Sequence, residues 1–381
     1  MTLSGRKALL WLHLWMGLAA AVFLFVEGIS GAALALRPEF NQFFFTHTEH
    51  VTSAGSDLSL AQLISKLEQA YPGREIARIS PGNARENPWS VRLQTGPRDQ
   101  DPLFLAVDPH TGGVLWNVNQ HVSPLQKTIG NVLSFFGRFH GNFLGSNIGR
   151  NVIAWTVVMM LLLGLSGVVL WWPRKILGLK GGSGAARQIF DLHNALGFYS
   201  SLLVVLFAFT TITMEWPRGT VNLINRLTGA PPSKILGGNG DDAPAANIQK
   251  GRKAAAPAAA KAVLGPDQLL KIAQAEVPNG TWAGVFMSAE GNMRFFATFK
   301  IPGEKAMATV AVNPAGGQVQ FRRIPGTLTP SERFVGLWMR DIHTGEIYGT
   351  PSRIVAMLFS LSLATLAVTG PLIWLTRRRR A

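Results

Sequence analysis

The sequence of 381 residues contains no cysteine. This absence excludes disulfide bonds, thiolate nucleophiles, iron–sulfur clusters and zinc sites built on cysteine. The eight histidines therefore remain as the soft side chains that could bind a transition metal or a haem iron.

Acidic residues are scarce, because 21 Asp and Glu oppose 36 Lys and Arg and leave a formal charge of +15. Hydrophobic residues make up 47% of the chain, and this combination is typical of a membrane protein with basic flanks. Much of the basic excess lies beside apolar runs, at Arg6 and Lys7, between Arg174 and Arg187, and from Arg377 to Arg380. Anionic lipid and membrane topology explain this distribution better than nucleic acid, which is not expected as a partner.

Four apolar runs are long enough to cross about 30 Å of hydrocarbon. They cover residues 9–36, 152–173, 189–215 and 353–376. A cleaved signal peptide is the alternative for the first run, but that run is about twice as long as the usual apolar core of a signal peptide. The basic residues at both chain ends and in the 174–188 connection place all three in the cytoplasm.

The stretch from His140 to Arg174 resembles a second stretch, from His343 to Arg377, which indicates an internal duplication. Laid without a gap, five landmark residues coincide: His140 with His343, Arg150 with Arg353, Gly167 with Gly370, Trp171 with Trp374 and Arg174 with Arg377. The two other spans match as well, through Leu12-His13 with Gly17 and Leu192-His193 with Gly197. The chain therefore consists of two copies of one unit, made of a span, an outer segment, a histidine turn and a second span.

Each outer segment predicts a helix followed by alternating strands. The first has a helix at 58–73, strands at 88–95 and 103–109, and a turn from Asp108 to Val114. The second has a helix at 264–280, strands at 293–301 and 307–314, and a turn from Asn313 to Val319. A tract rich in Gly, Ala, Pro and Lys between Ala230 and Ala262 is expected to be a flexible linker.

His13 and His193 lie about two helical turns inside their spans, at a depth where an ionisable side chain is uncommon and usually functional. Two histidines at one depth on different spans could bind the same haem iron. Gly17 and Gly197 lie one turn further along the same helix face and would leave room for a porphyrin. The alternative is a neutral histidine that is hydrogen-bonded to a neighbouring helix.

His140 and His343 precede the outer ends of their spans, where they would hold a second haem. Arg150 and Arg353 run against the positive-inside bias, so an anionic group is expected beside them. Haem propionates are one choice for that group and a lipid phosphate is the other.

The histidines without repeat partners are expected to be surface or turn residues: His47, His50, His110 and His121. His47 or His50 also remains as an alternative outer ligand, since both follow the first span closely.

The Asp-Pro-x-Thr-Gly-x-Val turn at 108–114, the Leu-His-x-x-x-Gly span starts and the histidine-turn-Arg-span units that end in Trp resemble the PepSY-associated transmembrane family. The resemblance covers essentially the full length. Within the family, the chain looks most like the FoxB-like inner-membrane ferric-siderophore reductases, which carry haem in four spans. The second turn departs from the pattern at Asn313 and Gly316, which weakens the idea that this turn is a catalytic site.

The resemblance implies a membrane α-helical fold, with four transmembrane helices in two pseudo-repeats and two small α+β, PepSY-like periplasmic modules. It also implies the bacterial inner membrane. The predicted order is span 9–36, module 37–139, histidine turn and span 140–173, cytoplasmic loop 174–188, span 189–215, linker and module 216–342, histidine turn and span 343–376, and cytoplasmic tail 377–381.

Two b-type haems on opposite sides of the bilayer, with His13, His193, His140 and His343 as axial ligands, would lie ~15–20 Å apart along the membrane normal and could relay electrons. The sequence has no Gly-x-Gly-x-x-Gly that follows a strand and opens a helix, and its cytoplasmic connections are too short for a flavin or nicotinamide domain. Electrons would then come from a partner protein, from quinol or from a soluble reductant.

The expected activity is that of a haem-dependent oxidoreductase that reduces a ferric siderophore in the periplasm and releases Fe(II) for iron uptake. Reduction would release the metal because hard oxygen donors hold Fe(III) better than Fe(II). One alternative is a quinol-linked b-type cytochrome that serves another acceptor. The other is a non-redox PepSY regulatory or transport protein whose histidines titrate protons.

Overall fold

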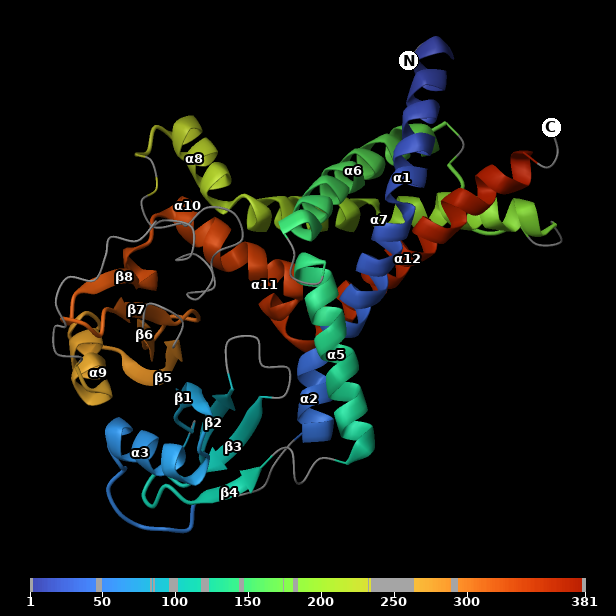
Figure 1. Ribbon diagram of the computed structural model, residues 1–381. Coiled ribbons are helices and arrows are strands. Elements are labelled where there is room, and N and C mark those ends of the chain that lie inside the picture. The colour runs from blue at the N-terminus through green and yellow to red at the C-terminus, as the bar shows by residue number, and fades with distance from the viewer. Residues whose placement is uncertain are drawn as a thin grey trace. The chain divides into compact units, whose positions relative to one another are not determined.

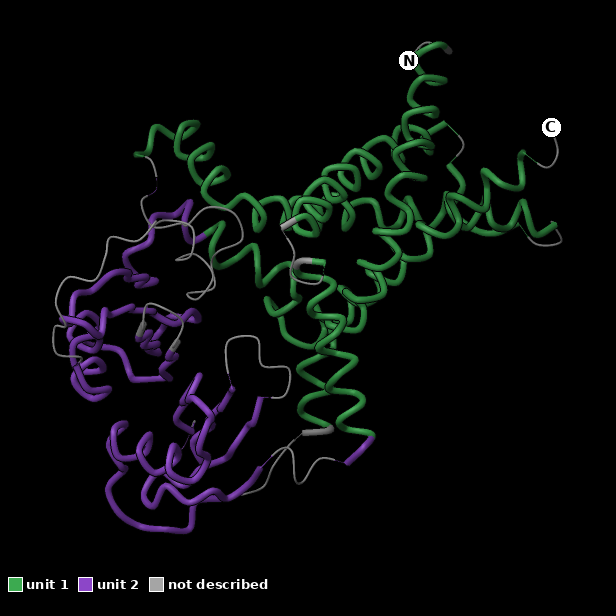
Figure 2. The backbone as a smooth tube through the Cα atoms, viewed as in Figure 1, with its two compact units in different colours: residues 1–46, 125–232, 334–381 green, residues 47–124, 233–333 purple. Residues whose placement is uncertain are grey.

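The computed structural model describes residues 3–45, 50–82, 84, 86–95, 102–117, 123–143, 147–173, 175–180, 184–231, 233, 264–288 and 294–378. These residues form two compact units, a helical unit (1–46, 125–232 and 334–381) and a sheet unit (47–124 and 233–333) (Figures 1 and 2). The chain therefore leaves the helical unit and returns to it twice. Residues 234–262 of the predicted linker lie outside the described residues.

The helical unit contains four long helices, α1 (Leu3–Ala35), α6 (Asn147–Trp171), α7 (Ala185–Glu215) and α12 (Thr350–Arg378). Each is long and apolar enough to cross a membrane, which confirms the four predicted apolar spans. Helices α1 and α7 each pack against both α6 and α12. Large apolar side chains that face away from this bundle, such as Val22, Trp155 and Leu202, are more than 60% exposed, which suits a hydrocarbon environment.

Shorter helices also belong to the helical unit. They are α2 (Arg37–Phe45), α5 (Pro124–Asn142), α8 (Pro217–Thr228) and α11 (Met339–Thr344), with the π-helical turn η2 (Phe334–Trp338) and the 3₁₀ turn η3 (Glu346–Tyr348). The sheet unit is therefore narrower than the module ranges 37–139 and 216–342 that the sequence suggests.

Gly28 allows α1 and α12 to approach closely. A Cβ atom at this position would lie 2.7 Å from the carbonyl oxygen of Ser360 and 2.8 Å from the amide nitrogen of Ala364. Both atoms belong to the backbone and cannot rotate away, so any side chain at position 28 would push the two helices apart.

The sheet unit is built on one antiparallel sheet of eight strands, in the order β4-β3-β2-β1-β5-β6-β7-β8. The strands are β1 (Glu75–Ser80), β2 (Trp89–Gln94), β3 (Leu103–Val107), β4 (Val114–Asn117), β5 (Thr281–Ser288), β6 (Arg294–Lys300), β7 (Ala308–Val312) and β8 (Val319–Arg323). The two predicted modules are thus joined edge to edge, because β1 pairs with β5 through Arg78 opposite Phe286 and Ile79 opposite Val285.

A single hydrophobic core lies between this sheet and two helices, α3 (Leu60–Ala70) and α9 (Pro266–Ala275). Strand β2 alternates in burial, with Trp89, Val91 and Leu93 on the inner face. Helix α3 begins at the N-cap Ser59 in a capping box with Gln62. The carboxylate of Asp267, from α9, also accepts the amide hydrogen of Leu60 at 2.8 Å, so each half of the unit stabilises the other.

The turns after β3 and β7 have the same hydrogen bonds. Gly112 donates its amide hydrogen to the carbonyl of Asp108 at 2.8 Å, and Gly317 donates to the carbonyl of Asn313 at 2.8 Å. Both glycines have a φ of 73°, in the left-handed region that side chains disfavour. The turn chemistry in the sequence is therefore structural at both positions.

Asp108 is buried beneath its turn and accepts hydrogen bonds from the Ser53 hydroxyl (2.6 Å) and the amides of His110 (2.9 Å) and Thr111 (3.3 Å). Burial alone raises the pKa of this carboxyl, but the hydrogen bonds outweigh burial and lower it. The stability that Asp108 contributes is consequently present above the unfolded pKa of about 3.9 and is lost as the pH falls through the lower folded-state pKa.

The substitution Asp108→Asn is expected to keep the turn, since the side-chain oxygen of Asn313 accepts the Ala315 amide (3.0 Å) at the matching place. Loss of the charge should lower the free energy of unfolding by about 1 kcal/mol near neutral pH. Thermal unfolding of the full chain in detergent between pH 7 and pH 3 would measure this difference. It should shrink with acidification, and a constant difference would contradict the assigned role of the carboxylate.

Candidate functional site

His13 on α1 has a fixed ring orientation. Its Nδ1 lies 2.8 Å from the hydroxyl oxygen of Ser166 on α6, and that hydroxyl donates its own hydrogen to the carbonyl of Leu162 at 2.6 Å. A serine hydroxyl has one hydrogen, so Ser166 can only accept from the ring. Nδ1 of His13 therefore carries the hydrogen, and Nε2 carries a free lone pair.

His193 on α7 repeats this arrangement. Its Nδ1 lies 2.9 Å from the hydroxyl oxygen of Thr369 on α12, which donates to the carbonyl of Thr365 at 2.9 Å. The same argument assigns the hydrogen to Nδ1 and the lone pair to Nε2. Hydrogen bonding of one ring nitrogen to a fixed acceptor, with the other left as a base, is the usual preparation of a metal-binding histidine.

His13 and His193, the first histidine pair, line one cavity of about 630 Å³ between α1, α6, α7 and α12. Its wall is largely apolar and aromatic, with Trp11, Phe198 and Trp374 among the lining residues. A volume between about 300 and 1,000 Å³ with few polar groups is typical of a site for a cofactor or another small ligand. Two imidazoles therefore line a cavity of this kind.

Glycines keep this cavity open. Gly17 and Gly197 both line it, as do Gly167 and Gly370. A Cβ atom at Gly167 would lie 3.5 Å from Cε1 of His13, and one at Gly370 would lie 3.6 Å from Cε1 of His193. A larger side chain at either glycine would fill the space beside the ligand ring, because Cε1 is bonded to Nε2.

Three arginines also line the cavity, Arg6 on α1 and Arg377 and Arg378 on α12. Two of them lie over aromatic rings, with Arg377 5.4 Å from the ring centroid of Phe190 and Arg378 4.5 Å from that of Trp374. Nε of Arg6 is buried and has no hydrogen-bond partner within the described parts of the chain. These guanidinium groups could bind the carboxylates of an anionic ligand.

His343 and His140 form the second histidine pair. Nδ1 of His343, on α11, lies 3.0 Å from the hydroxyl oxygen of Thr210 on α7, and Thr210 donates to the carbonyl of Phe207 at 2.9 Å. Nδ1 of His140, on α5, lies 3.1 Å from the hydroxyl oxygen of Ser30 and 2.9 Å from a carboxylate oxygen of Glu27, both on α1. Ser30 donates to the carbonyl of Val26 at 2.7 Å, so His140 also carries its hydrogen on Nδ1.

The structure brings the rings of His140 and His343 together, with centroids 6.1 Å apart and planes inclined by 41°. Two imidazoles that bind one iron through Nε2 have centroids ~6 Å apart, since each iron–nitrogen bond is about 2 Å long and each nitrogen lies about 1 Å from its ring centre. The separation of the second pair thus fits bis-histidine ligation.

The four hydroxyl anchors lie at matching positions in the sequence. Ser30 and Thr210 each lie seventeen residues after the first-pair histidine of the same helix. Ser166 and Thr369 each immediately precede one of the cavity glycines, Gly167 or Gly370. At 1.5 Å per residue, the level of Ser30 lies ~25 Å along α1 from the level of His13, so the two pairs occupy opposite ends of the bundle.

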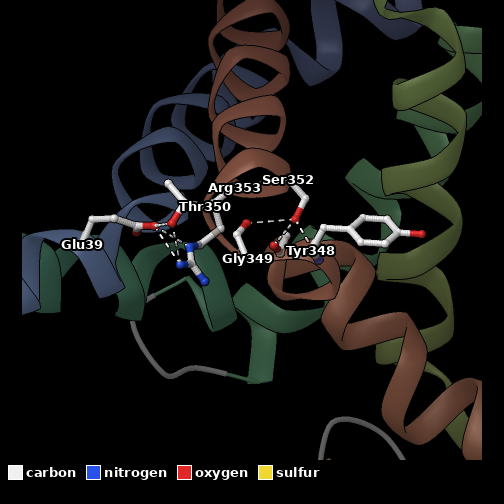
Figure 3. A network of polar contacts seen from close by, with 7 residues as sticks. Glu39, Tyr348, Gly349, Thr350, Ser352 and Arg353 are labelled. Atoms are coloured by element: carbon white, nitrogen blue, oxygen red, sulfur yellow. Dashed lines mark hydrogen bonds and ion pairs between the residues drawn. The ribbon is translucent and has the colours of Figure 1, made fainter.

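Arg353, at the start of α12, forms an ion pair with Glu39 of α2 (Figure 3). Its Nε donates to the Glu39 carboxylate at 2.8 Å, and the Thr350 hydroxyl donates to the same oxygen at 2.8 Å. Burial alone raises the pKa of Glu39, but the bonds from Arg353 and Thr350 outweigh it and lower the pKa. Arg150, at the start of α6, interacts electrostatically with Glu215 at the end of α7. The predicted contact of these arginines with propionates remains a prediction.

Gly345 shapes the chain between His343 and Arg353. It ends α11 with a φ of 74°, and a Cβ atom there would lie 2.9 Å from backbone atoms of Arg353. The Ser352 hydroxyl oxygen lies within hydrogen-bond distance of the carbonyl oxygens of Gly345 and Gly349, which share its one hydrogen, and it closes the turn. Figure 3 shows the contact with Gly349. This tight connection fixes His343 beside the first turn of α12.

The other predicted histidines lie elsewhere. His110 lies in the turn of the sheet unit with its Nδ1 3.2 Å from Asp57, and His50 is exposed. His47 and His121 lie outside the described residues.

Sequence reasoning missed the hydroxyl anchors and Glu27. The anchors could have been found from the repeat, because Ser166-Gly167 and Thr369-Gly370 share one register. Glu27 could have been found as the one acidic residue in the first apolar run, where a charge is costly and usually has a function.

Four helices long and apolar enough to cross a membrane, with a histidine pair toward each end of their bundle, define the class of this protein as a helical membrane protein. The PepSY-associated TM region family matches residues 10–377, and the chain belongs to this family. No curated protein matches the chain.

Proposed function

We propose that this protein is a di-haem electron-transfer protein that carries electrons across the bacterial inner membrane and reduces a ferric siderophore on the periplasmic side. The observation that supports it most is how the rings of His13, His193, His140 and His343 are anchored and paired. Each is held through Nδ1, which leaves Nε2 as a free base, and the histidines are grouped in two pairs.

In this proposal, His13 and His193 hold one haem b in the cavity, and His140 and His343 hold the second. When bound, each haem supplies a one-electron redox centre whose potential its surroundings set. Ser166, Thr369, Thr210 and Ser30 orient the ligand rings, and Gly167 and Gly370 keep the space beside Nε2 clear. Arg6 and Arg377 are placed to bind propionates of the first haem.

The proposed orientation, with the first pair near the cytoplasm and the second near the periplasm, is supported by the basic chain ends through the positive-inside rule. The electron donor in this proposal is a quinol, a reduced partner protein or a soluble reductant. One electron converts Fe(III) to Fe(II) in the siderophore, and the hard oxygen ligands then release the metal more readily. The substrate class rests on the resemblance to ferric-siderophore reductases.

Absorption spectra of the purified protein test the proposal. A strong Soret band that shifts on addition of dithionite, with about two haems per chain, is expected. Reduced protein should then release Fe(II) from several ferric siderophores, as measured with a ferrous chelator, and boiled protein serves as the control. A folded, colourless preparation that gains no Soret band when haem is added would contradict the proposal and favour a non-redox role.

A further inference from the structure

The second histidine pair is chemically asymmetric. Nδ1 of His140 lies 2.9 Å from the carboxylate of Glu27 in addition to its contact with Ser30, whereas Nδ1 of His343 has only hydroxyl partners, Thr210 at 3.0 Å and Thr211 at 3.4 Å. One ring therefore donates its hydrogen to an anionic acceptor, and the other donates to neutral ones.

The asymmetry breaks the repeat at one position. Counting from the first-pair histidines, Glu27 of α1 corresponds to Phe207 of α7, since each lies fourteen residues on. The Phe207 ring lies 5.3 Å from the ring of His343 and stacks on Phe359. An aromatic contact thus occupies, in one copy, the place that the carboxylate occupies in the other.

Glu27 is unfavourable for the stability of the helix bundle. It lies within a long apolar helix, and its Oε1 is buried without a hydrogen-bond partner among the described residues. A carboxylate in such a place costs free energy that the hydrophobic packing of a phenylalanine would avoid. Its position against His140 therefore points to a role through that histidine.

We propose that Glu27 is a positioning residue that lowers the reduction potential of the haem at the second pair; this inference rests on the proposed function. A carboxylate that accepts the Nδ1 hydrogen makes the imidazole a stronger electron donor to iron. The same negative charge stabilises Fe(III) over Fe(II) electrostatically. Both effects make the reduced haem a stronger reductant, which suits an acceptor whose hard oxygen donors stabilise Fe(III).

Glu27→Gln is the decisive variant, because an amide oxygen can still accept the Nδ1 hydrogen while the charge is removed. The second-pair haem should remain bound, and its ratio of reduced to oxidised form at a fixed potential should rise about tenfold, which equals about 59 mV for a one-electron couple. The first-pair haem should keep its potential. Spectroelectrochemical titration of the full chain, with electron paramagnetic resonance of the oxidised protein, measures both.

Glu276→Gln is the matched control. It removes one carboxylate that is bound to Arg322 in the sheet unit rather than to a ligand histidine, so neither potential should shift. Glu27→Asp keeps the negative charge but moves it away from His140, because the side chain is one methylene shorter. The reduction potential of the second-pair haem should therefore rise less than in the glutamine variant.

Haem content is measured in every variant first. Wild-type protein without haem would overturn the proposed function itself. Two haems in Glu27→Gln with unchanged potentials and resonance signals would overturn only the role of Glu27. An equal shift in the control Glu276→Gln would overturn it as well. If Glu27→Gln fails to fold, Glu27→Asp decides, and an unchanged second-pair potential in that variant overturns the inference.

Discussion

Replacing His343 by alanine is expected to remove one of the two haems and to abolish the reduction of a ferric siderophore outside the membrane. His343 is anchored to Thr210 on α7 and faces His140 with a centroid separation of 6.1 Å, so alanine would leave one of two axial ligands. The first pair should still accept electrons, because its ligands lie at the other end of the bundle. About half of the pigment per protein should remain.

The measurement combines haem content, a redox titration and Fe(II) release in the same membranes. His110→Ala provides the matched control, since His110 interacts with Asp57 in the sheet unit and should leave the haem content and reduction unchanged. Siderophore reduction by His343→Ala at the wild-type rate would refute the relay. Retention of both haems would instead indicate that the ligand is His47 or His50 rather than His343.

A double variant of Arg150 and Arg353 should have a smaller effect than His343→Ala. Arg353 is bound to Glu39 and Thr350, so its removal chiefly breaks the contact between α2 and α12. Loss of positive charge near the second pair should shift the potential of its haem while the iron ligands stay in place.

The sequence predicts the four spans well, because each is a long apolar run that no other fold class explains. It predicts strands β2, β3, β6 and β7 from their alternation of apolar and polar residues. It does not predict the pairing of β1 with β5, which joins the two modules along one sheet edge. Irregularities lie on both sides of that edge, between Ile76 and Arg78 in β1 and between Trp282 and Gly284 in β5, and they disturb the alternation. Pairing of distant strands is also a tertiary property that a local pattern does not contain.

The candidate site was predictable only as far as the repeat extends. Histidines inside apolar runs are rare enough to be noticed, and their register pairs them. Serines and threonines in helices commonly donate to a carbonyl one turn back, so Ser166 and Thr369 have no distinguishing sequence signal of their own. Their function depends on the second lone pair of the hydroxyl oxygen, which only the packing of a neighbouring helix can bring to a histidine.

The first histidine pair is expected to share one haem, so His13→Ala and His193→Ala should each remove the same haem and leave about half of the pigment. The reason is that both rings line one cavity between α1, α6, α7 and α12 and expose the same nitrogen. Difference spectra and the remaining midpoint potential identify which haem is lost. Loss of different haems in the two variants would refute the pairing.

Variants of the hydroxyl anchors test the same site, with a partial loss of haem affinity expected instead of complete loss of the haem. Ser166→Ala and Thr369→Val should keep the ligand but free its ring to rotate, which should weaken haem binding by about 10- to 100-fold. Ser200→Ala is the matched control, because the Ser200 hydroxyl donates to the carbonyl of Leu196 and, among the described residues, has no hydrogen bond to a histidine. Haem titration into depleted protein measures the affinities. Equal affinities for Ser166→Ala and Ser200→Ala would mean that the His13 ring is held by the cavity wall alone, whereas a loss confined to the anchor variants would show that the repeat preserves a ligand together with the group that orients it.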